Sequence, residues 1–279
     1  MTATEKIILF LARGFFAALP FERGKQTTAN AIYVKLLPRI KGQAKLKAGT
    51  IKYLLDLHDR IQAIFYLTNL YETKTLNAAL RILSQQKSNP VILDVGANVG
   101  LLSLQIKNRI PTAQIHMFEA DPTVYRQLEK NISLNQVTGL KLNNLAVSAS
   151  NGDTLTFVKS QLSTESGWGR IENDENRNHL TEKFQVRSIS IDQYLKENEI
   201  DHVDLLKIDV EGAETLVLSG ARQALEAQIF QTIICEINPE ALAAFSSSPE
   251  EVIYLLTHRG YEVSEQADMN TFFRRKPKR

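Results

Sequence analysis

Some segments of this chain have the apolar pattern of strands, and others have apolar positions at helical spacing. Each change from one pattern to the other indicates a new strand or helix. Short segments rich in apolar residues predict strands at 91–95, 115–118, 140–148, 203–210 and 231–237, and the continuous apolar run at 91–93 is typical of a strand covered on both faces. Apolar positions at helical spacing predict the intervening helices, at 101–109, 123–135, 192–197, 215–226 and 249–259. Two short alternating runs, 261–264 and 271–274, predict a final antiparallel pair. The pattern indicates an α/β fold with a mostly parallel, seven-stranded sheet and helices on both faces.

The first 75 residues follow a different pattern. Ile7 to Leu19 form the most apolar stretch, which Arg13 interrupts and which is too short to cross a bilayer. It predicts a helix packed on the body of the protein or on a partner, with contact to a membrane surface as the alternative. Apolar positions from Ile51 to Tyr71 recur at helical spacing and predict a second helix. We therefore expect an N-terminal helical extension or cap at 1–75 and an α/β domain at 76–279.

Composition narrows the classes of function. A formal net charge of +2 over 279 residues gives no general attraction to nucleic acid or to membranes. Cys235 is the only cysteine, so the chain has no internal disulfide and no cysteine-based metal cluster. Since disulfides mark oxidising compartments, the simplest expectation is a reducing, cytoplasmic setting. Nothing in the chain calls for a metal.

A glycine turn follows the strand at 91–95 and is the first sign of a ligand site. It reads Asp94-Val-Gly96-Ala-Asn98-Val-Gly100, and a helical pattern begins directly after it. Glycines let the backbone approach a ligand where a Cβ would collide, and the helix points its free N–H groups at the same place. The spacing differs from the Gly-x-Gly-x-x-Gly of dinucleotide sites. Asp94 would repel a pyrophosphate but suits the ammonium group of S-adenosylmethionine.

The next two strands end near this turn. Glu119 follows the strand at 115–118 and corresponds to the acidic residue that accepts both ribose hydroxyls in doubly wound sheets. Ala120 follows it, and the third strand has its carboxyl end near Ala146, where we expect an adenine ring to be held by backbone and apolar contacts.

The fourth strand carries charges that a buried strand does not need. Alternation places Lys207 and Asp209 on one face, and a lysine inside such a strand is anomalous unless it is paired. It pairs with a carboxylate, or it contacts cofactor or substrate. Glu211 and Glu214 follow where a new helix begins, and three acids at this edge exceed what helix capping requires.

Residues that could contact a substrate come from three other segments. Tyr71 and Glu72 lie just before the α/β domain, and Glu236 and Asn238 end the fifth strand. Trp168 lies in a long polar stretch within an insertion at about 151–190, which we interpret as a substrate lid or as a disordered loop.

With the glycine turn and the stretch Lys207-Ile-Asp-Val-Glu-Gly-Ala-Glu214 together, the chain resembles the FkbM family of S-adenosylmethionine-dependent methyltransferases. The resemblance covers roughly residues 71–240, and the second motif is the specific one. It implies a Rossmann-like class I methyltransferase fold. Relatives often read Glu-x-His at the end of the fifth strand, whereas Asn238 takes the third place here, so the resemblance assigns no general base to that position.

The resemblance implies an O-methyltransferase that acts on a hydroxyl group of a sugar, glycan or natural-product metabolite. An aliphatic hydroxyl needs a positioned base before it attacks a methyl group. We expect Asp209 to serve as that base or to orient the acceptor, with Lys207, Glu211 and Glu214 in support. Two alternatives stay open: a methyltransferase-like binding or assembly module without catalysis, and a nicotinamide-dependent oxidoreductase. The chain has neither the Asn/Asp-Pro-Pro-aromatic stretch of amide N-methyltransferases nor a Pro-Cys nucleophile.

Overall fold

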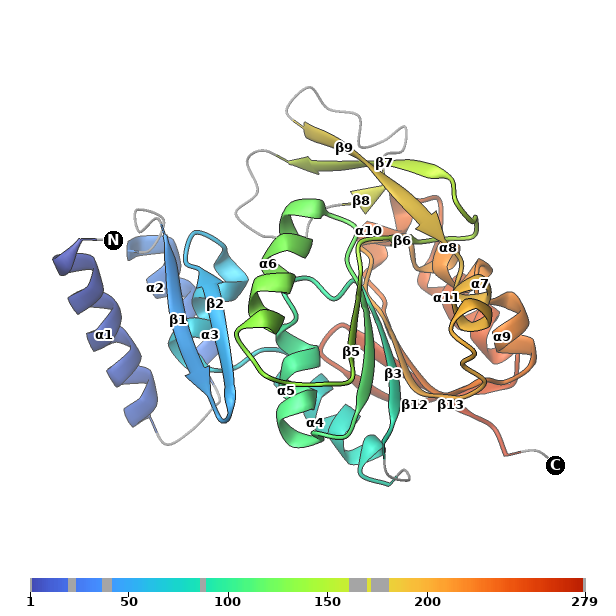
Figure 1. The fold of residues 1–279 in the computed structure, drawn as a ribbon, viewed down its shortest axis with the longest axis horizontal. Coiled ribbons are helices and arrows are strands. Elements are labelled where there is room, and N and C mark those ends of the chain that lie inside the picture. Colours follow the sequence, from blue (N-terminus) through green and yellow to red (C-terminus); the bar gives the residue numbers. More distant parts are fainter. Residues whose placement is uncertain are drawn as a thin grey trace.

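A computed structural model describes residues 2–19, 24–36, 42–85, 89–160, 170–171 and 181–277. The N-terminal elements are α1 (Ala3–Ala18), α2 (Lys25–Leu36), β1 (Gln43–Ala48), β2 (Ile51–Asp56) and α3 (Arg60–Thr68). The capping box of Thr2 and Glu5 starts α1, and the Asp59 side chain caps α3 by accepting from the Gln62 N–H. Helices α1 and α2 both pack on α3 (Figure 1).

The predicted helix over 51–71 is wrong in its first part. Residues 51–56 form strand β2, which pairs with β1 in an antiparallel hairpin. Ile51, Tyr53 and Leu55 are buried while Lys52 is exposed, so the period is two residues until α3 begins. Apolar residues at 51, 53, 55 and 57 also fit a helical stripe when they are read together with those of α3, which explains the error.

The main sheet has seven strands, as predicted, and their order is β12-β13-β11-β10-β3-β4-β5. Their bounds are β3 (Val91–Val95), β4 (Gln114–Phe118), β5 (Leu140–Asn143), β10 (Val203–Ile208), β11 (Phe230–Glu236), β12 (Tyr261–Ala267) and β13 (Asn270–Arg275). All neighbours pair in parallel except β13, which runs antiparallel to β11 and β12. The fold is therefore Rossmann-like, and it brings the carboxyl ends of β3, β4, β10 and β11 to one edge.

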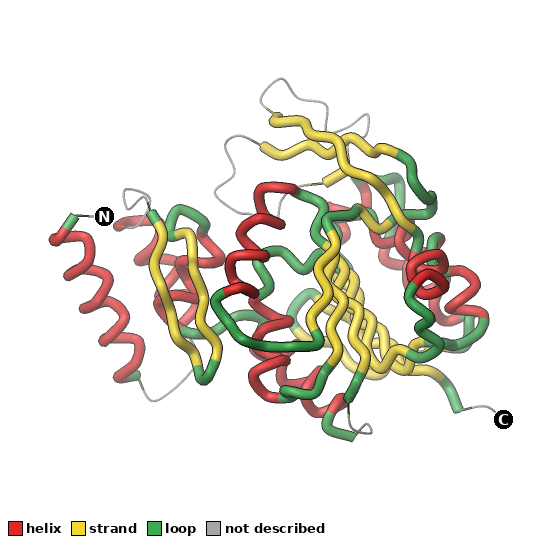
Figure 2. Tube along the Cα trace, in the orientation of Figure 1, coloured by secondary structure: helices red, strands yellow, loops and turns green. Residues whose placement is uncertain are grey.

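Helices cover both faces of this sheet (Figures 1 and 2). One face packs against α4 (Thr73–Leu83), α5 (Leu101–Arg109) and α6 (Pro122–Ser133). The other packs against α7 (Ile191–Glu197), α8 (Glu214–Ser219), α9 (Arg222–Glu226) and α11 (Pro249–Thr257). The single helix predicted over 215–226 is divided into α8 and α9, and a short α10 (Pro239–Ala243) follows β11.

A second sheet lies over the carboxyl edge of the first. Its strands are β6 (Ala146–Val147), β7 (Thr154–Ser160), β8 (Arg170–Ile171) and β9 (Thr181–Ile189), in the order β6-β9-β7-β8. The predicted strand at 140–148 is therefore two strands in different sheets, β5 and β6. Strands β7 and β9 confirm the two alternating runs of the insertion, while Trp168 lies outside the described residues.

Candidate active site

A cavity of about 380 Å³ opens where the carboxyl ends of β3, β4, β10 and β11 meet. The main sheet, the second sheet and the segment that joins α3 to α4 all contribute to it. Of the residues predicted for cofactor, substrate or catalysis, eleven line this cavity: Tyr71, Glu72, Gly96, Asn98, Glu119, Ala120, Ala146, Asp209, Glu211, Glu236 and Asn238. The sequence motifs therefore converge on one site.

Gly96 joins the glycine turn to the fourth core strand. Its φ is +84°, and a Cβ built on it would lie 1.8 Å from the backbone oxygen of Asp209. The Asp209 N–H also donates to the oxygen of Val95 at 3.0 Å. Because the two backbones touch, only glycine fits here, and the Asp209 side chain is held beside the turn.

Glu119 is fixed by the backbone around it. Its Oε2 accepts from the N–H of Asn98 at 2.9 Å, and its Oε1 accepts from the N–H of Asp121 at 2.8 Å. Asp121 in turn caps α6 and accepts from the N–H of Thr123 at 2.7 Å. A carboxylate oxygen has more than one lone pair, so Glu119 keeps acceptor capacity for hydroxyl groups in the cavity.

Lys207 is paired, which resolves the anomaly of a lysine inside a strand. Its side chain is 3% exposed, and its Nζ donates to Oδ2 of Asp209 at 2.7 Å. Burial alone lowers the pKa of Lys207, but the carboxylates of Asp209, Glu72 and Asp94 outweigh it and raise that pKa. Burial likewise raises the pKa of Asp209, and the Lys207 charge outweighs it and lowers that pKa. The ion pair is therefore charged at neutral pH.

Glu236 lies beside this pair and behaves differently. Burial, followed by the negative charge of Asp209, raises the pKa of Glu236 to about 10. At neutral pH Glu236 therefore carries a proton, which it donates in a hydrogen bond to Asp209. Asp209, Glu211 and Glu236 each offer an oxygen within 4.8 Å of the others, a spacing that suits a divalent cation as well as a shared proton.

Tyr71 and Glu72 line the same cavity and lie within electrostatic reach of Asp209. Burial, followed by the charge of Glu72, raises the pKa of Tyr71 well above its usual value. Burial also raises the pKa of Glu72, which Lys207 opposes, and a hydrogen bond joins Tyr71 to Glu72. Glu72 adopts a φ of 41°, an uncommon left-handed conformation for a non-glycine residue. Backbone in such a conformation is frequent at ligand sites.

Some predicted residues lie behind the cavity rather than on its lining. Asp94 is buried on β3, and its Oδ2 accepts from the Ser103 hydroxyl at 2.6 Å. Glu214 is buried, and its Oε1 accepts from the N–H of Val210 at 3.1 Å and of Gly212 at 3.2 Å. Lys207 and Gly100 are likewise absent from the lining. These residues lie behind the lining and support the residues that form it.

The cavity also contains residues that the sequence did not indicate. Arg60 and Ile61 come from α3, Phe157 and Ile171 from the second sheet, and Met269 from the turn before β13. Phe157 stacks on Phe184 with ring centroids 5.6 Å apart. Arg60 and Ile61 follow a helix cap and carry no motif, so no local signal identifies them. For Phe157, an aromatic side chain within an alternating strand of the insertion was an available signal.

The lining fits an adenosyl cofactor. Gly96 contributes backbone to the lining, Glu119 presents a carboxylate, and Ala120 and Ala146 offer small apolar surfaces. The order of these groups along β3, β4 and β6 matches the order expected for the amino-acid, ribose and adenine parts of such a molecule.

Comparisons with known proteins give a family and several relatives. A family model described as "Methyltransferase FkbM domain" matches residues 94–263. The chain is 31% identical to the AMB antimetabolite synthetase AmbE of Pseudomonas aeruginosa, over 64% of this chain and 10% of that protein. It is 28% identical to the 2-O-methyltransferase NoeI of Sinorhizobium fredii, over 55% of this chain and 66% of that one.

A third relative is the hexuronic acid methyltransferase AglP of Haloferax volcanii, at 24% identity over 74% of this chain and 83% of that protein. The first of the three relatives is much longer than this chain, which spans about a tenth of its length. The matched residues 94–263 include the glycine turn, Glu119, Asp209 and Glu236.

Proposed function

Because this chain belongs to the FkbM family of methyltransferases, we propose that its cavity moves a methyl group from S-adenosylmethionine to a hydroxyl group of a sugar, glycan or other small molecule. One observation carries the proposal: the ionised carboxylate of Asp209 lies on the cavity lining, directly beside the glycine turn that receives the cofactor. A base therefore stands next to the methyl donor.

When bound, the cofactor supplies an electrophilic methyl group on a sulfonium. The residues of this chain bind and orient it. Glu119 accepts hydrogen bonds from the ribose hydroxyls, and Ala120 and Ala146 border the adenine. The backbone of Gly96 and Asn98 lies against the amino-acid end of the cofactor. Asp94 acts from behind the turn, where its carboxylate is anchored by Ser103 and favours a nearby positive charge.

Asp209 removes the proton of the acceptor hydroxyl as its oxygen attacks the methyl group. Lys207 holds Asp209 in its charged form and fixes its direction through the 2.7 Å contact, so it acts as a positioning residue. The acceptor oxygen would gain the methyl group as the bond from that group to the sulfonium sulfur breaks, which would leave S-adenosylhomocysteine, and the hydroxyl proton would pass to Asp209 and then to water. Most of the rate enhancement comes from holding the acceptor and the base in one reactive geometry.

Glu236, Glu211, Asn238, Tyr71 and Glu72 are the polar groups that orient the acceptor. Several hydrogen-bonding groups in so small a cavity suit a polyhydroxylated molecule, of which one hydroxyl reaches Asp209. Two relatives carry names that state 2-O-methylation and hexuronic acid methylation, which supports a sugar hydroxyl as the acceptor. Glu214 holds the turn at 210–212 and supports the site through its backbone.

Calorimetric titration with S-adenosylhomocysteine, and separately with NAD, tests the cofactor. We expect micromolar binding of the first alone, and loss of that binding in Glu119→Ala. Binding of NAD alone would instead favour an oxidoreductase. Glu129→Gln is a matched control, because Glu129 is an exposed carboxylate on α6 outside the cavity.

Turnover with a panel of hydroxylated sugars, followed by S-adenosylhomocysteine release, tests the reaction. Asp209→Asn should keep cofactor binding and lose turnover, because the amide cannot accept a proton. If Asp209→Asn retains full biological function, the binding-module alternative is favoured over catalysis.

A further inference from the structure

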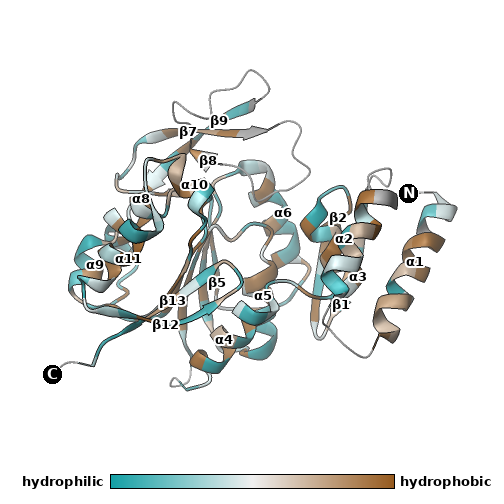
Figure 3. Ribbon diagram, turned by 180° about the vertical axis from the view of Figure 1, so that it is seen from behind, coloured by the Kyte–Doolittle hydropathy of each residue, from teal (hydrophilic) through white to brown (hydrophobic). Residues whose placement is uncertain are grey.

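Helix α1 has two apolar sides, and only one of them packs against the protein. Leu9 and Phe16 are buried against α2 and α3 in a small core. On the other side Ile7, Phe10, Leu11 and Phe15 are 59%, 76%, 64% and 51% exposed. Figure 3 shows hydrophobic colours along most of α1. Single exposed apolar residues are ordinary, but a helix that is apolar on two sides indicates that a second partner covers the exposed side.

The exposed residues lie close together. Ile7, Leu11 and Phe15 are spaced by four residues and form one stripe, with Phe10 beside it. Among the residues that the structure describes, none buries this stripe. We define the stripe of Ile7, Phe10, Leu11 and Phe15 as the apolar face of α1. A contiguous patch of this kind marks an interaction site.

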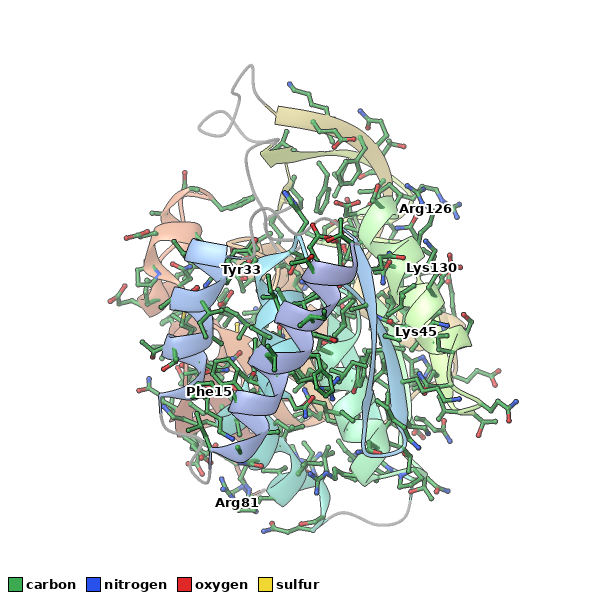
Figure 4. The ribbon with its side chains drawn as sticks, turned by 90° about the vertical axis from the view of Figure 1, so that its left-hand side faces the viewer. Phe15, Tyr33, Lys45, Arg81, Arg126 and Lys130 are labelled. Atoms are coloured by element: carbon green, nitrogen blue, oxygen red, sulfur yellow. The ribbon has the colours of Figure 1, made fainter. Side chains whose placement is uncertain are left out.

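Basic side chains lie along one side of this face. On the neighbouring hairpin Lys45, Lys47 and Lys52 are exposed, and on α6 Arg126 and Lys130 are exposed. The hairpin and α6 are joined by hydrogen bonds, including one that the Leu54 N–H donates to Asn131 Oδ1 at 2.7 Å. Figure 4 looks onto α1, with Phe15 labelled on it and Lys45, Arg126 and Lys130 along one side. Glu129 is the exposed acid among the α6 residues between them.

The charge of the whole chain is divided in the same way. Residues 1–75 contain 12 Lys and Arg against 5 Asp and Glu, whereas residues 76–279 contain 21 against 26. The small overall net charge therefore conceals a basic N-terminal segment and an acidic remainder. A basic segment with an exposed apolar helix complements a surface that has anionic groups outside and an apolar layer beneath them.

We propose that the apolar face of α1 docks on an anionic lipid bilayer, with α1 lying in the plane of the interface. The apolar residues enter the boundary between headgroups and acyl chains, and the lysines of the hairpin contact the headgroups. No helix within the described ranges is long and apolar enough to cross a membrane, so the contact is peripheral. A second copy of the chain fits less well, because a symmetric pairing through this face brings the two basic segments together.

This inference is independent of the methyl acceptor, and its test needs no activity. Full-length protein is sedimented with vesicles of phosphatidylcholine containing about 30 mol% phosphatidylserine, and with vesicles of phosphatidylcholine alone. Binding to the anionic vesicles that weakens in high salt, with little binding to the neutral ones, supports the proposal. Equal binding to both, or none, overturns it.

Two pairs of variants locate the contact. Phe10→Ser with Phe15→Ser removes exposed apolar surface and keeps the buried residues Leu9 and Phe16, at the cost of the edge-on ring contact between Phe15 and Phe16. Vesicle binding should fall roughly tenfold or more. Tyr254→Ser with Val263→Ser is the matched control, since these exposed apolar residues lie on α11 and β12. Equal loss in both pairs overturns the proposal.

Lys45→Gln with Lys47→Gln should weaken vesicle binding by roughly fivefold per charge. Lys196→Gln with Arg222→Gln, on α7 and α9 away from α1 in Figure 1, should leave it unchanged. Sedimentation velocity without lipid tests whether a second copy of the chain, and not a bilayer, covers the apolar face of α1. Concentration-dependent dimers that the phenylalanine variant abolishes would assign the face to a second copy and overturn the proposal.

Discussion

The backbone oxygen of Asp209 occupies the place where a side chain on Gly96 would stand, 1.8 Å from its ideal Cβ position. The two residues belong to the two motifs that identify the family. Under the proposed function, their contact joins the turn that would receive the cofactor to the strand end that carries the proposed base. Cofactor binding and methyl transfer would then depend on the same backbone contact.

Replacement of Gly96 by alanine should break this contact. The Cβ collides with backbone, which cannot move aside as a flexible side chain can, and we expect the free energy of unfolding to fall by about 3 kcal/mol or more. Gly152→Ala is the control, because Gly152 also has a positive φ but nothing lies within 4 Å of its Cβ position. It should lose only about 1 to 2 kcal/mol. Urea unfolding measures both, and equal losses would contradict the collision.

Glu119→Gln should weaken S-adenosylhomocysteine binding by roughly 10- to 100-fold, since hydrogen bonds to a charged acceptor are worth about 1.5 to 3 kcal/mol. The amide keeps one oxygen but turns the other position into a donor, which faces the N–H of Asn98 or Asp121. Calorimetric titration gives the dissociation constant. Unchanged binding would remove Glu119 from the cofactor site.

Lys207→Met should destabilise the protein by about 3 to 5 kcal/mol, because it leaves the buried carboxylate of Asp209 without its cation. Adding Asp209→Asn removes the unpaired charge and should restore much of that loss, while turnover stays absent. Denaturant unfolding of the two single variants and the double variant measures the coupling. Additive losses in this cycle would show that the pair contributes little.

Stability should fall as pH rises from about 4.5 to about 10. The pKa of Glu236 is raised from 4.5 to about 10 by burial and then by Asp209, so the folded protein holds a proton that the unfolded chain releases. Between these two pKa values the unfolded state binds fewer protons, and the unfolding free energy declines by up to about 1.4 kcal/mol per pH unit.

Glu236→Gln mimics the protonated side chain and should remove this dependence. Its stability relative to the wild type should therefore increase from roughly pH 6 to pH 9. Urea unfolding at several pH values supplies the comparison. Parallel pH profiles for the two proteins would show that Glu236 is ionised in the folded state.

Treatment with EDTA should leave turnover unchanged. Lys207 neutralises Asp209, and the proton on Glu236 removes a second charge, so the acids at the cavity are compensated without a divalent ion. S-adenosylhomocysteine release is measured before and after dialysis against the chelator. Loss of activity that Mg²⁺ or Mn²⁺ restores would assign a metal to Asp209, Glu211 and Glu236.

Sequence patterns predicted the main sheet well because its central strands are mostly apolar and bounded by polar turns. They also located most of the cavity, since Gly96, Glu119, Asp209 and Glu236 all follow strands that end at one edge. The prediction was wrong at Ile51 to Asp56, where the apolar positions fit both a helical and a two-residue period. In the structure their burial alternates along a strand.

Contacts between distant segments were not predictable in the same way. The partner of Lys207 was left open, because strand alternation places Asp209 on its face while the neighbouring strand offers Asp94. Arg60 and Ile61 reach the cavity only because α3 lies beside α6 and the turn, a placement that tertiary packing decides. Glu214 has the sequence position of a site residue, and its burial and backbone contacts place it behind the lining.

Arg60, Ile61, Tyr71 and Glu72 line the cavity, yet all four precede residue 94, where the family match begins. Under the proposed function, the residues that bind the cofactor lie mostly within the family match, and part of the acceptor site comes from the segment before it. Exchange of this N-terminal segment with that of a relative would then change acceptor preference while the methyl donor stays the same. For enzyme engineering, the segment before residue 94 is therefore the part of this chain to vary first.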